Sequence, residues 1–224
     1  MKDLILLHGA LGSSKEFQTL KTLLKDDYKV HLLDFEGHGD RQSSQPFSIQ
    51  LFADNLATYL KEKQLTQVNV FGYSMGGYVA LYLAAQGNNR LGKIATLGTK
   101  FLWNPAVAQQ EVKKLNPAII QEKVPRFANY LASIQSDWVL NMEKTAEMML
   151  NMGDYPPFTS EQAELVQQEV TCALGELDEM VSESETIEIQ GSLPNGRFIQ
   201  LDGLKHPIST IQPEILAEFV RKEF

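Results

Sequence analysis

The segment Gly72-Tyr73-Ser74-Met75-Gly76 places a serine between two glycines, directly after an apolar run and directly before a helical pattern. A G-x-S-x-G motif in this setting predicts a sharp turn from strand to helix, in which a strained serine projects its hydroxyl outward. Such a hydroxyl is a candidate nucleophile. The alternative is that Ser74 simply caps the following helix, which is a common role for serine.

A serine hydroxyl is a poor nucleophile at neutral pH unless a base removes its proton, and that base is usually a histidine oriented by a carboxylate. We predict that the base is His206, because it lies in a loop after an apolar run at 197–201. The other three histidines fit less well. His8 and His38 lie in glycine-flanked turns, and His31 lies within a predicted strand.

The carboxylate is expected from the loop at 175–181, which also follows an apolar run. Asp178 is the first candidate in this loop, and Glu176 is the main alternative. Asp202 is close to His206 in sequence, but strand geometry is expected to direct it elsewhere. The loop could also be no more than a solvated acidic cluster.

Acyl transfer at Ser74 would also need two backbone N–H groups directed at the oxyanion of a tetrahedral intermediate. Met75, the residue after the serine, is expected to supply one of them. The other is expected from the glycine-rich loop at 8–12, where Ala10 is the first candidate and Leu11 the second.

Short apolar runs alternate with longer amphipathic segments along the chain, and this alternation predicts an α/β fold with a mostly parallel central sheet flanked by helices. The predicted strands are 4–7, 29–33, 68–71, 94–97, 170–174 and 197–201. The predicted helices are 14–24, 49–63, 75–86 and 213–224. The candidate residues lie in the turns and loops that follow these strands.

Between the fourth and fifth predicted strands the composition changes to helical stretches with no convincing strand. Prolines punctuate this region at Pro105, Pro117, Pro125, Pro156 and Pro157. They predict three or four helices with turns at the prolines. We therefore divide the chain into a core of residues 1–99 and 166–224 and an inserted helical lobe of residues 100–165.

The chain has 224 residues, of which 43% are hydrophobic and 21% charged, a composition typical of one packed globular domain. Its formal net charge of −8 argues against nucleic acid and anionic membranes as partners. The one cysteine, Cys172, excludes an intramolecular disulfide, and no Cys/His cluster has zinc-like spacing. No apolar run is long enough for a signal peptide or a transmembrane helix, so we expect a soluble cytoplasmic protein.

Taken together, these residues resemble the α/β-hydrolase fold family over nearly the whole chain. The resemblance rests on His8-Gly9, the segment 34–39, the Ser74 turn, Gly175-x-x-Asp178 and His206, with the order Ser, Asp, His. It implies a sheet of about six strands and identifies the inserted lobe as a helical cap. Two positions depart from the family pattern: Lys205 stands where a glycine often precedes the histidine, and Ile211 where a glutamate is common.

The resemblance implies a serine hydrolase that cleaves a small or medium carboxylic ester through an acyl-enzyme, with no metal or organic cofactor. The cap would decide the substrate. Its predicted pocket residues are Lys100, Phe101, Trp103 and Trp138, with Phe127, Tyr130, Met142, Met148 and Met149 as further candidates. Lys100 could bind a substrate carboxylate, and the apolar residues would favour an apolar small molecule.

The same residues are compatible with other functions. A lyase, a C–C hydrolase or an aminopeptidase could use the same three residues. An aminopeptidase would want cap carboxylates near a substrate amine, and Glu111, Glu122, Glu143 and Glu147 are available. A small-molecule binding protein without turnover is the alternative from another class. Nothing in the sequence indicates an oligomeric state.

Overall fold

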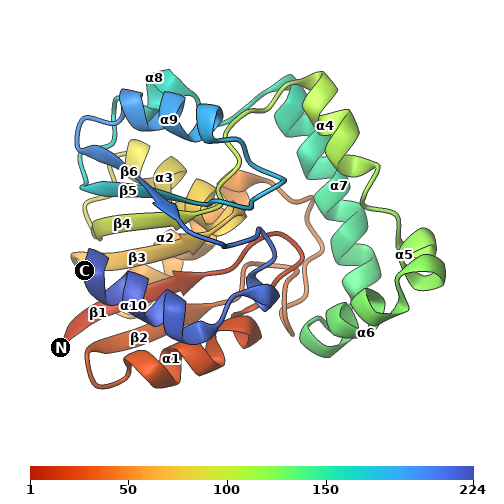
Figure 1. The fold of residues 1–224 in the computed structure, drawn as a ribbon, viewed down its shortest axis with the longest axis horizontal. Helices are drawn as coiled ribbons and strands as arrows, with labels where there is room; N and C mark the ends of the chain where they lie inside the picture. Colours follow the sequence, from red (N-terminus) through yellow and green to blue (C-terminus); the bar gives the residue numbers. More distant parts are fainter.

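The computed structural model describes residues 1–224 and contains one six-stranded sheet in the order β2-β1-β3-β4-β5-β6 (Figure 1). The strands are β1 (Lys2–Leu7), β2 (Tyr28–Leu33), β3 (Val68–Tyr73), β4 (Leu91–Leu97), β5 (Val170–Gly175) and β6 (Gly196–Leu201). Every neighbouring pair is parallel. Each predicted run falls within one of these strands, so the prediction of a parallel sheet is confirmed.

Helices cover both faces of the sheet. An apolar cluster of 32 buried residues joins one face to α2 (Ile49–Glu62), α3 (Met75–Ala85) and α9 (Glu183–Ser192). A second cluster of 18 buried residues joins the other face to α1 (Gln18–Leu24) and α10 (Pro213–Glu223). Side chains alternate between the faces along each strand. A strand buried on both faces therefore reads as a continuous apolar run, as in β1.

Strand order determines which loops meet. β1 lies between β2 and β3, so the chain proceeds from β1 in one direction to β2 and then returns past β1 to β3. Ligands of open α/β sheets bind at the carboxyl ends of strands near such a reversal. Here the reversal brings the loop after β1 beside the turn after β3.

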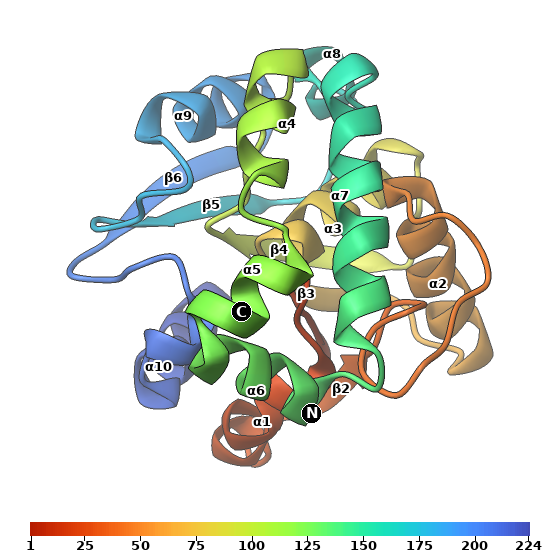
Figure 2. The ribbon, with the colours of Figure 1, turned by 90° about the vertical axis from the view of Figure 1, so that its right-hand side faces the viewer.

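An insertion of five helices separates β4 from β5. They are α4 (Pro105–Val112), α5 (Pro117–Lys123), α6 (Pro125–Ile134), α7 (Trp138–Asp154) and α8 (Ser160–Ala163). The first three begin at prolines, because the fixed φ of proline suits the first helical position and its missing N–H costs nothing there. The short α8 adds one helix to the three or four predicted. Helices α4 to α7 lie beyond the carboxyl ends of the strands (Figures 1 and 2).

The helices do not include a membrane-spanning segment: none combines the length and the apolar character that crossing a bilayer requires.

Candidate active site

Ser74 occupies the turn between β3 and α3 in a conformation that non-glycine residues rarely adopt, with φ 50° and ψ −117°. Its backbone is held from both sides. The Ser74 N–H donates to the Leu97 carbonyl at 2.8 Å, and the Thr99 hydroxyl donates to the Ser74 carbonyl at 2.9 Å. Although Ser74 stands at the N-cap position of α3, its hydroxyl makes no capping hydrogen bond. The capping interpretation therefore does not explain this serine.

The glycines of the motif are required by close backbone contacts. A Cβ at position 72 would lie 2.5 Å from the Cα of Gly77, and a Cβ at position 76 would lie 2.4 Å from the carbonyl oxygen of Leu7. Both distances are shorter than any normal carbon contact, and backbone atoms cannot move aside cheaply. The motif therefore allows α3 to start tightly against β1 and β3.

Asp178 and His206 form a hydrogen bond between Oδ2 and Nδ1 at 2.7 Å, in the loops after β5 and β6. The Asp178 side chain is 2% exposed and the His206 side chain 9% exposed. The other carboxylate oxygen, Oδ1, accepts from the N–H groups of Met180 at 2.8 Å and Val181 at 3.0 Å. The carboxylate is therefore held in one orientation, with Oδ2 facing the imidazole.

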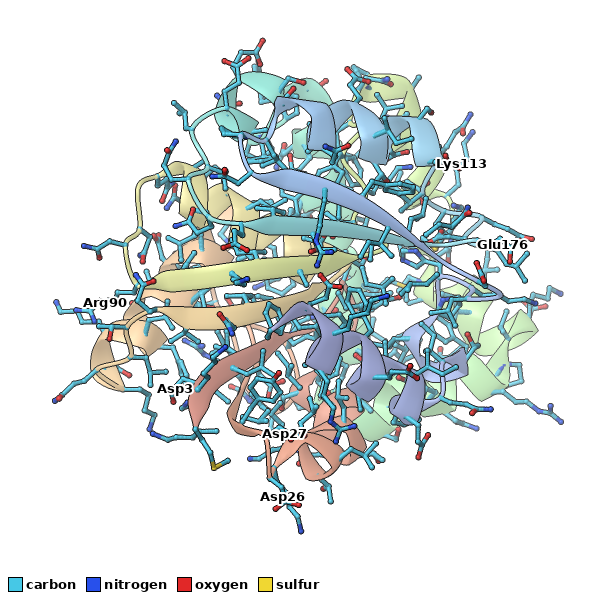
Figure 3. All side chains as sticks on the ribbon, turned by 60° about the vertical axis from the view of Figure 1, so that its left-hand side comes forward. Asp3, Asp26, Asp27, Arg90, Lys113 and Glu176 are labelled. Carbon is cyan, nitrogen blue, oxygen red and sulfur yellow. The ribbon has the colours of Figure 1, made fainter.

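The two alternative acids do not contact His206. Glu176 directly follows β5 at the edge of the molecule in Figure 3, where it is exposed and accepts from the Gly203 N–H at 2.8 Å. Asp202 is exposed at the end of β6. Lys205, which departs from the family pattern, is also exposed.

Two residues that we did not single out from the sequence support the His206 and Asp178 pair. Gly98 has φ +61°, and a Cβ there would lie 3.1 Å from Asp178 Oδ2 and 3.2 Å from His206 Nδ1. Tyr73 donates its hydroxyl to the His206 carbonyl at 2.7 Å. Burial raises the pKa of Tyr73 well above its usual value, so the phenol remains a neutral donor. The signals in the sequence were a glycine at a strand end and the tyrosine inside the serine motif.

A cavity lies next to the serine and the histidine. It is lined by 14 residues, of which ten are hydrophobic, and both Ser74 and His206 are among them. His206 forms a hydrogen bond with Asp178, but it forms none with Ser74. Catalytic hydrogen bonds in free enzymes are often long and tighten only with substrate. Ser74 and His206 therefore face the same cavity, whose remaining wall is mostly apolar.

The loop after β1 passes directly over Ser74. A Cβ at Gly9 would lie 2.8 Å from the Tyr73 ring and 3.2 Å from Ser74 Cβ. The Gly9 carbonyl accepts from the Gly12 N–H at 3.1 Å and contacts His8 Nδ1 at 2.8 Å. Because the trans peptide unit is planar, the Ala10 N–H points away from both partners.

The two predicted donors of this loop differ in placement. Ala10 lines the cavity beside Ser74 and Met75, whereas Leu11 does not line it. The Ala10 N–H makes no hydrogen bond with another backbone group. Met75 is the first residue of α3, where N–H groups lack an intrahelical partner. Ala10 and Met75 are therefore the pair of free donors that flank Ser74.

The predicted pocket residues divide into two groups. Lys100, Trp103, Met148 and Met149 line the cavity. Phe101 does not, because it is buried in the core with its ring stacked near Tyr78. Trp138 does not either, because it packs on a small apolar cluster inside the insertion, which also contains Met142. Phe127 and Tyr130 are likewise absent from the cavity wall.

Lys100 is already engaged within the protein. Its Nζ donates to the Met180 carbonyl at 3.0 Å and lies 3.8 Å from Glu111 Oε1 and 4.0 Å from Glu185 Oε2. Glu111, which also lines the cavity, accepts from Lys114 at 2.8 Å. The two lysines therefore balance the charge of the two glutamates beside the cavity.

His8 and His38 form a buried pair behind the loop after β1, with ring centroids 4.9 Å apart. The Phe35 N–H donates to His8 Nε2 at 3.2 Å, so His8 is neutral with its proton on Nδ1. His38 Nε2 has no partner. Burial lowers the pKa of His8, and burial together with repulsion from His8 lowers the pKa of His38 well below its ordinary value.

The free energy of unfolding is therefore expected to fall as the pH is lowered from about 7 to 5. Below pH 6.5 the unfolded histidines bind protons that the folded ones do not, and the loss is up to about 1.4 kcal/mol per pH unit for each histidine. Urea unfolding of the wild type and of His38→Gln at several pH values would test this. The variant should show a shallower pH dependence. An unchanged slope would contradict the prediction.

No group of three or more His, Cys, Asp or Glu side chains is placed to hold a metal ion.

The parallel sheet, the serine turn after β3 and the linked loops of Asp178 and His206 together define an α/β protein of the hydrolase type. Comparison with known proteins supports the same class. A family model described as alpha/beta hydrolase fold matches residues 3–116, which is just over half of the chain. The chain therefore belongs to the alpha/beta hydrolase fold family.

Curated relatives match only part of the chain. A pimeloyl-[acyl-carrier protein] methyl ester esterase from Neisseria meningitidis serogroup C is 37% identical over 86 residues, which are 38% of this chain and 32% of the relative. The matched segments span between about a quarter and a half of the length of the first curated relatives.

Solved structures match over the full chain. A marine microorganism esterase aligns with a TM-score of 0.77 at 19% identity, covering 100% of this chain and 95% of its own. The enol-lactonase from Burkholderia xenovorans LB400 aligns with a TM-score of 0.79 at 18% identity, covering 99% and 90%. At these identities the similarity establishes the fold.

Proposed function

We propose that this chain is a serine hydrolase that cleaves a carboxylic ester, with Ser74 as nucleophile, His206 as general base and Asp178 as the group that orients the base. The observation that carries the proposal is the 2.7 Å contact between Asp178 and His206, at a cavity that His206 shares with the strained Ser74. The names of the relatives add support, because esters and lactones share one reactive bond.

In the proposed first step, Ser74 Oγ attacks the ester carbonyl carbon while His206 Nε2 takes the hydroxyl proton. The carbonyl electron pair moves to oxygen, and the resulting oxyanion accepts from the N–H groups of Ala10 and Met75. When the intermediate collapses, the C–O bond to the alcohol breaks and the alcohol oxygen takes the proton from His206. An acyl group remains on Ser74.

In the second step, water attacks the acyl-enzyme while His206 removes its proton. The second tetrahedral intermediate uses the same two N–H donors. Its collapse returns the proton to Ser74 Oγ and releases the carboxylic acid. Asp178 stabilises the imidazolium in both steps by accepting from Nδ1, and the Met180 and Val181 N–H groups hold that carboxylate in place.

The cavity supports a small or medium, mostly apolar ester. Its wall includes Trp103 from the start of the insertion and three methionines of α7, Met148, Met149 and Met152, which are flexible apolar side chains that adapt to irregular ligands. Lys100 shares its charge with Glu111 and Glu185. We therefore propose a neutral substrate, with residues 100–165 acting as a cap over the site.

The ion pair between Lys100 and Glu111 also argues against the aminopeptidase alternative, which needs a carboxylate that is free to bind a substrate amine. Glu111 is the one candidate carboxylate that lines the cavity, and it already contacts Lys100 and Lys114. Glu122, Glu143 and Glu147 are exposed outside it. A lyase, a C–C hydrolase and a binding protein without turnover are separated from an esterase by the experiment that follows.

Incubation with a fluorophosphonate probe is expected to add one phosphonyl group to the wild type, with loss of fluoride, and none to Ser74→Ala, because the probe reacts with an activated serine. Hydrolysis of p-nitrophenyl acetate and butyrate, measured in parallel, should disappear in the same variant. Ser192→Ala alters a serine at the end of α9 that does not line the cavity, and it serves as the matched control. A folded wild type with neither labelling nor turnover would refute the proposal. Labelling without ester turnover would favour a lyase or C–C hydrolase.

A further inference from the structure

We propose that Gln135, in the insertion, is a positioning residue that holds the oxyanion loop at 9–12 in its working conformation. The inference rests on the proposed function, since the Ala10 N–H has this role only in acyl transfer. It gives the insertion a second role. Besides covering the cavity, the insertion keeps the Ala10 donor in place.

The side chain of Gln135 uses both of its N–H donors and its carbonyl oxygen on two core loops. Nε2 donates to the carbonyls of Leu11 at 2.8 Å and Gly12 at 2.7 Å, and Oε1 accepts from the Gly39 N–H at 2.7 Å. Gln135 is 4% exposed, so water does not compete for these groups. The next residue, Ser136, adds a backbone bond to the Gly39 carbonyl at 2.8 Å.

The loop needs this support because its conformation is strained. Leu11 has φ +59°, which costs free energy in a residue other than glycine. Its side chain turns away from the cavity and packs on the insertion cluster that contains Ile120 and Leu131. Gln135 binds the carbonyl of Leu11 itself and that of the next residue, Gly12. The strain and its restraint thus lie at the same residues.

A second contact ties the same segment to the insertion. The Tyr130 hydroxyl, on α6, donates to Glu16 Oε1 at 2.6 Å, and Glu16 Oε2 accepts from the Ser13 N–H at 3.1 Å. Burial raises the pKa of Glu16, and these two donors oppose the rise. The turn at 12–16 is therefore fixed to α6, while Gln135, at the C-terminal end of α6, fixes the turn at 9–12.

With these contacts, the loop that carries the Ala10 N–H is anchored at two places. His8 and Gly12 hold the Gly9 carbonyl from the core side, and Gln135 holds the Leu11 and Gly12 carbonyls from the insertion side. Loss of the second anchor leaves a glycine-flanked loop free to relax toward unstrained backbone. An N–H displaced by about 1 Å from the developing oxyanion loses most of its effect on the rate.

The test compares Gln135→Met, which keeps the length of the side chain but removes all three hydrogen bonds, with Gln135→Glu, which keeps the acceptor and removes both donors. For each variant we would measure kcat and KM for p-nitrophenyl acetate and the inhibition constant of an aryl trifluoromethyl ketone. This ketone adds to Ser74 and forms an oxyanion, so its affinity reports the N–H donors directly. Thermal melting confirms that each variant is folded at the assay temperature.

Both variants are expected to lower kcat/KM and ketone affinity by a common factor of about 10 to 100, with KM changed by less than about threefold. Lys144→Met is the matched control. It removes two hydrogen bonds from the insertion to the carbonyls of Ser43 and Gln45 and leaves the 9–12 loop untouched.

Ketone affinity that stays within about twofold of wild type in both Gln135 variants would overturn the inference, even if their melting temperatures fall. Equal losses in Lys144→Met would also overturn it, because the effect would then be general to the insertion. If Gln135→Met does not fold, Gln135→Glu alone decides. A wild type that neither labels nor turns over esters would refute the proposed function itself, which the wild-type measurement shows before any variant is compared.

Discussion

Asp178→Asn is expected to lower kcat for ester hydrolysis by about 10⁴-fold while leaving the fold intact. The reason lies in the two N–H groups that bind Asp178 Oδ1, those of Met180 and Val181. An asparagine must keep its carbonyl oxygen toward these donors, which places its NH₂ group against His206 Nδ1. The imidazole must then carry its proton on Nε2, where it cannot accept the proton of Ser74.

The measurement is steady-state hydrolysis of p-nitrophenyl acetate, with the rate of fluorophosphonate labelling as a second readout. Glu176→Gln is the matched control: it changes an acid in the same loop whose carboxylate binds the Gly203 N–H instead of His206. We expect kcat of this control to stay within about threefold of wild type. A loss smaller than about tenfold in Asp178→Asn, or a larger loss in Glu176→Gln, would contradict the assigned role.

The residues of this site could be predicted because their signals are local. Gly72 and Gly76 stand next to Ser74 in sequence, and the contacts that require them lie within the same turn and its neighbouring strand. The strands could be predicted because burial on both faces makes each one a continuous apolar run. The structure joins His206 to Asp178 rather than to Glu176. In the sequence, both acids lie in the loop after a strand, and only the resemblance to the hydrolase family, through Gly175-x-x-Asp178, favours Asp178.

What the sequence did not predict depends on contacts between distant segments. Gln135 lies in a polar stretch without a motif, and its three partners are more than 90 residues away in the chain. Phe101 and Trp138 are apolar and belong to the insertion region, but only packing decides whether such a side chain faces a cavity or a core. Helix α9 was missed because few of its residues are buried and apolar.

Gly76→Ala is expected to lower the free energy of unfolding by about 3 kcal/mol and to reduce esterase activity strongly. The added Cβ would lie 2.4 Å from the Leu7 carbonyl oxygen, 2.7 Å from the Leu7 carbonyl carbon and 2.8 Å from the His8 carbonyl oxygen. These atoms cannot yield separately, because Leu7 pairs with both β2 and β3. The displacement would therefore pass along β1 into the loop that carries Ala10, which links the loss of stability to the loss of activity.

Urea unfolding and p-nitrophenyl acetate hydrolysis test both parts of this prediction. Gly191→Ala, in α9, is the matched control, since no atom outside its own stretch of helix lies within 4 Å of its added Cβ. Alanine there should leave activity unchanged and should raise stability, by no more than about 1 kcal/mol, because alanine favours helix more than glycine. If Gly76→Ala were as stable and active as Gly191→Ala, the tight contact between α3 and β1 would not be what fixes the geometry around Ser74.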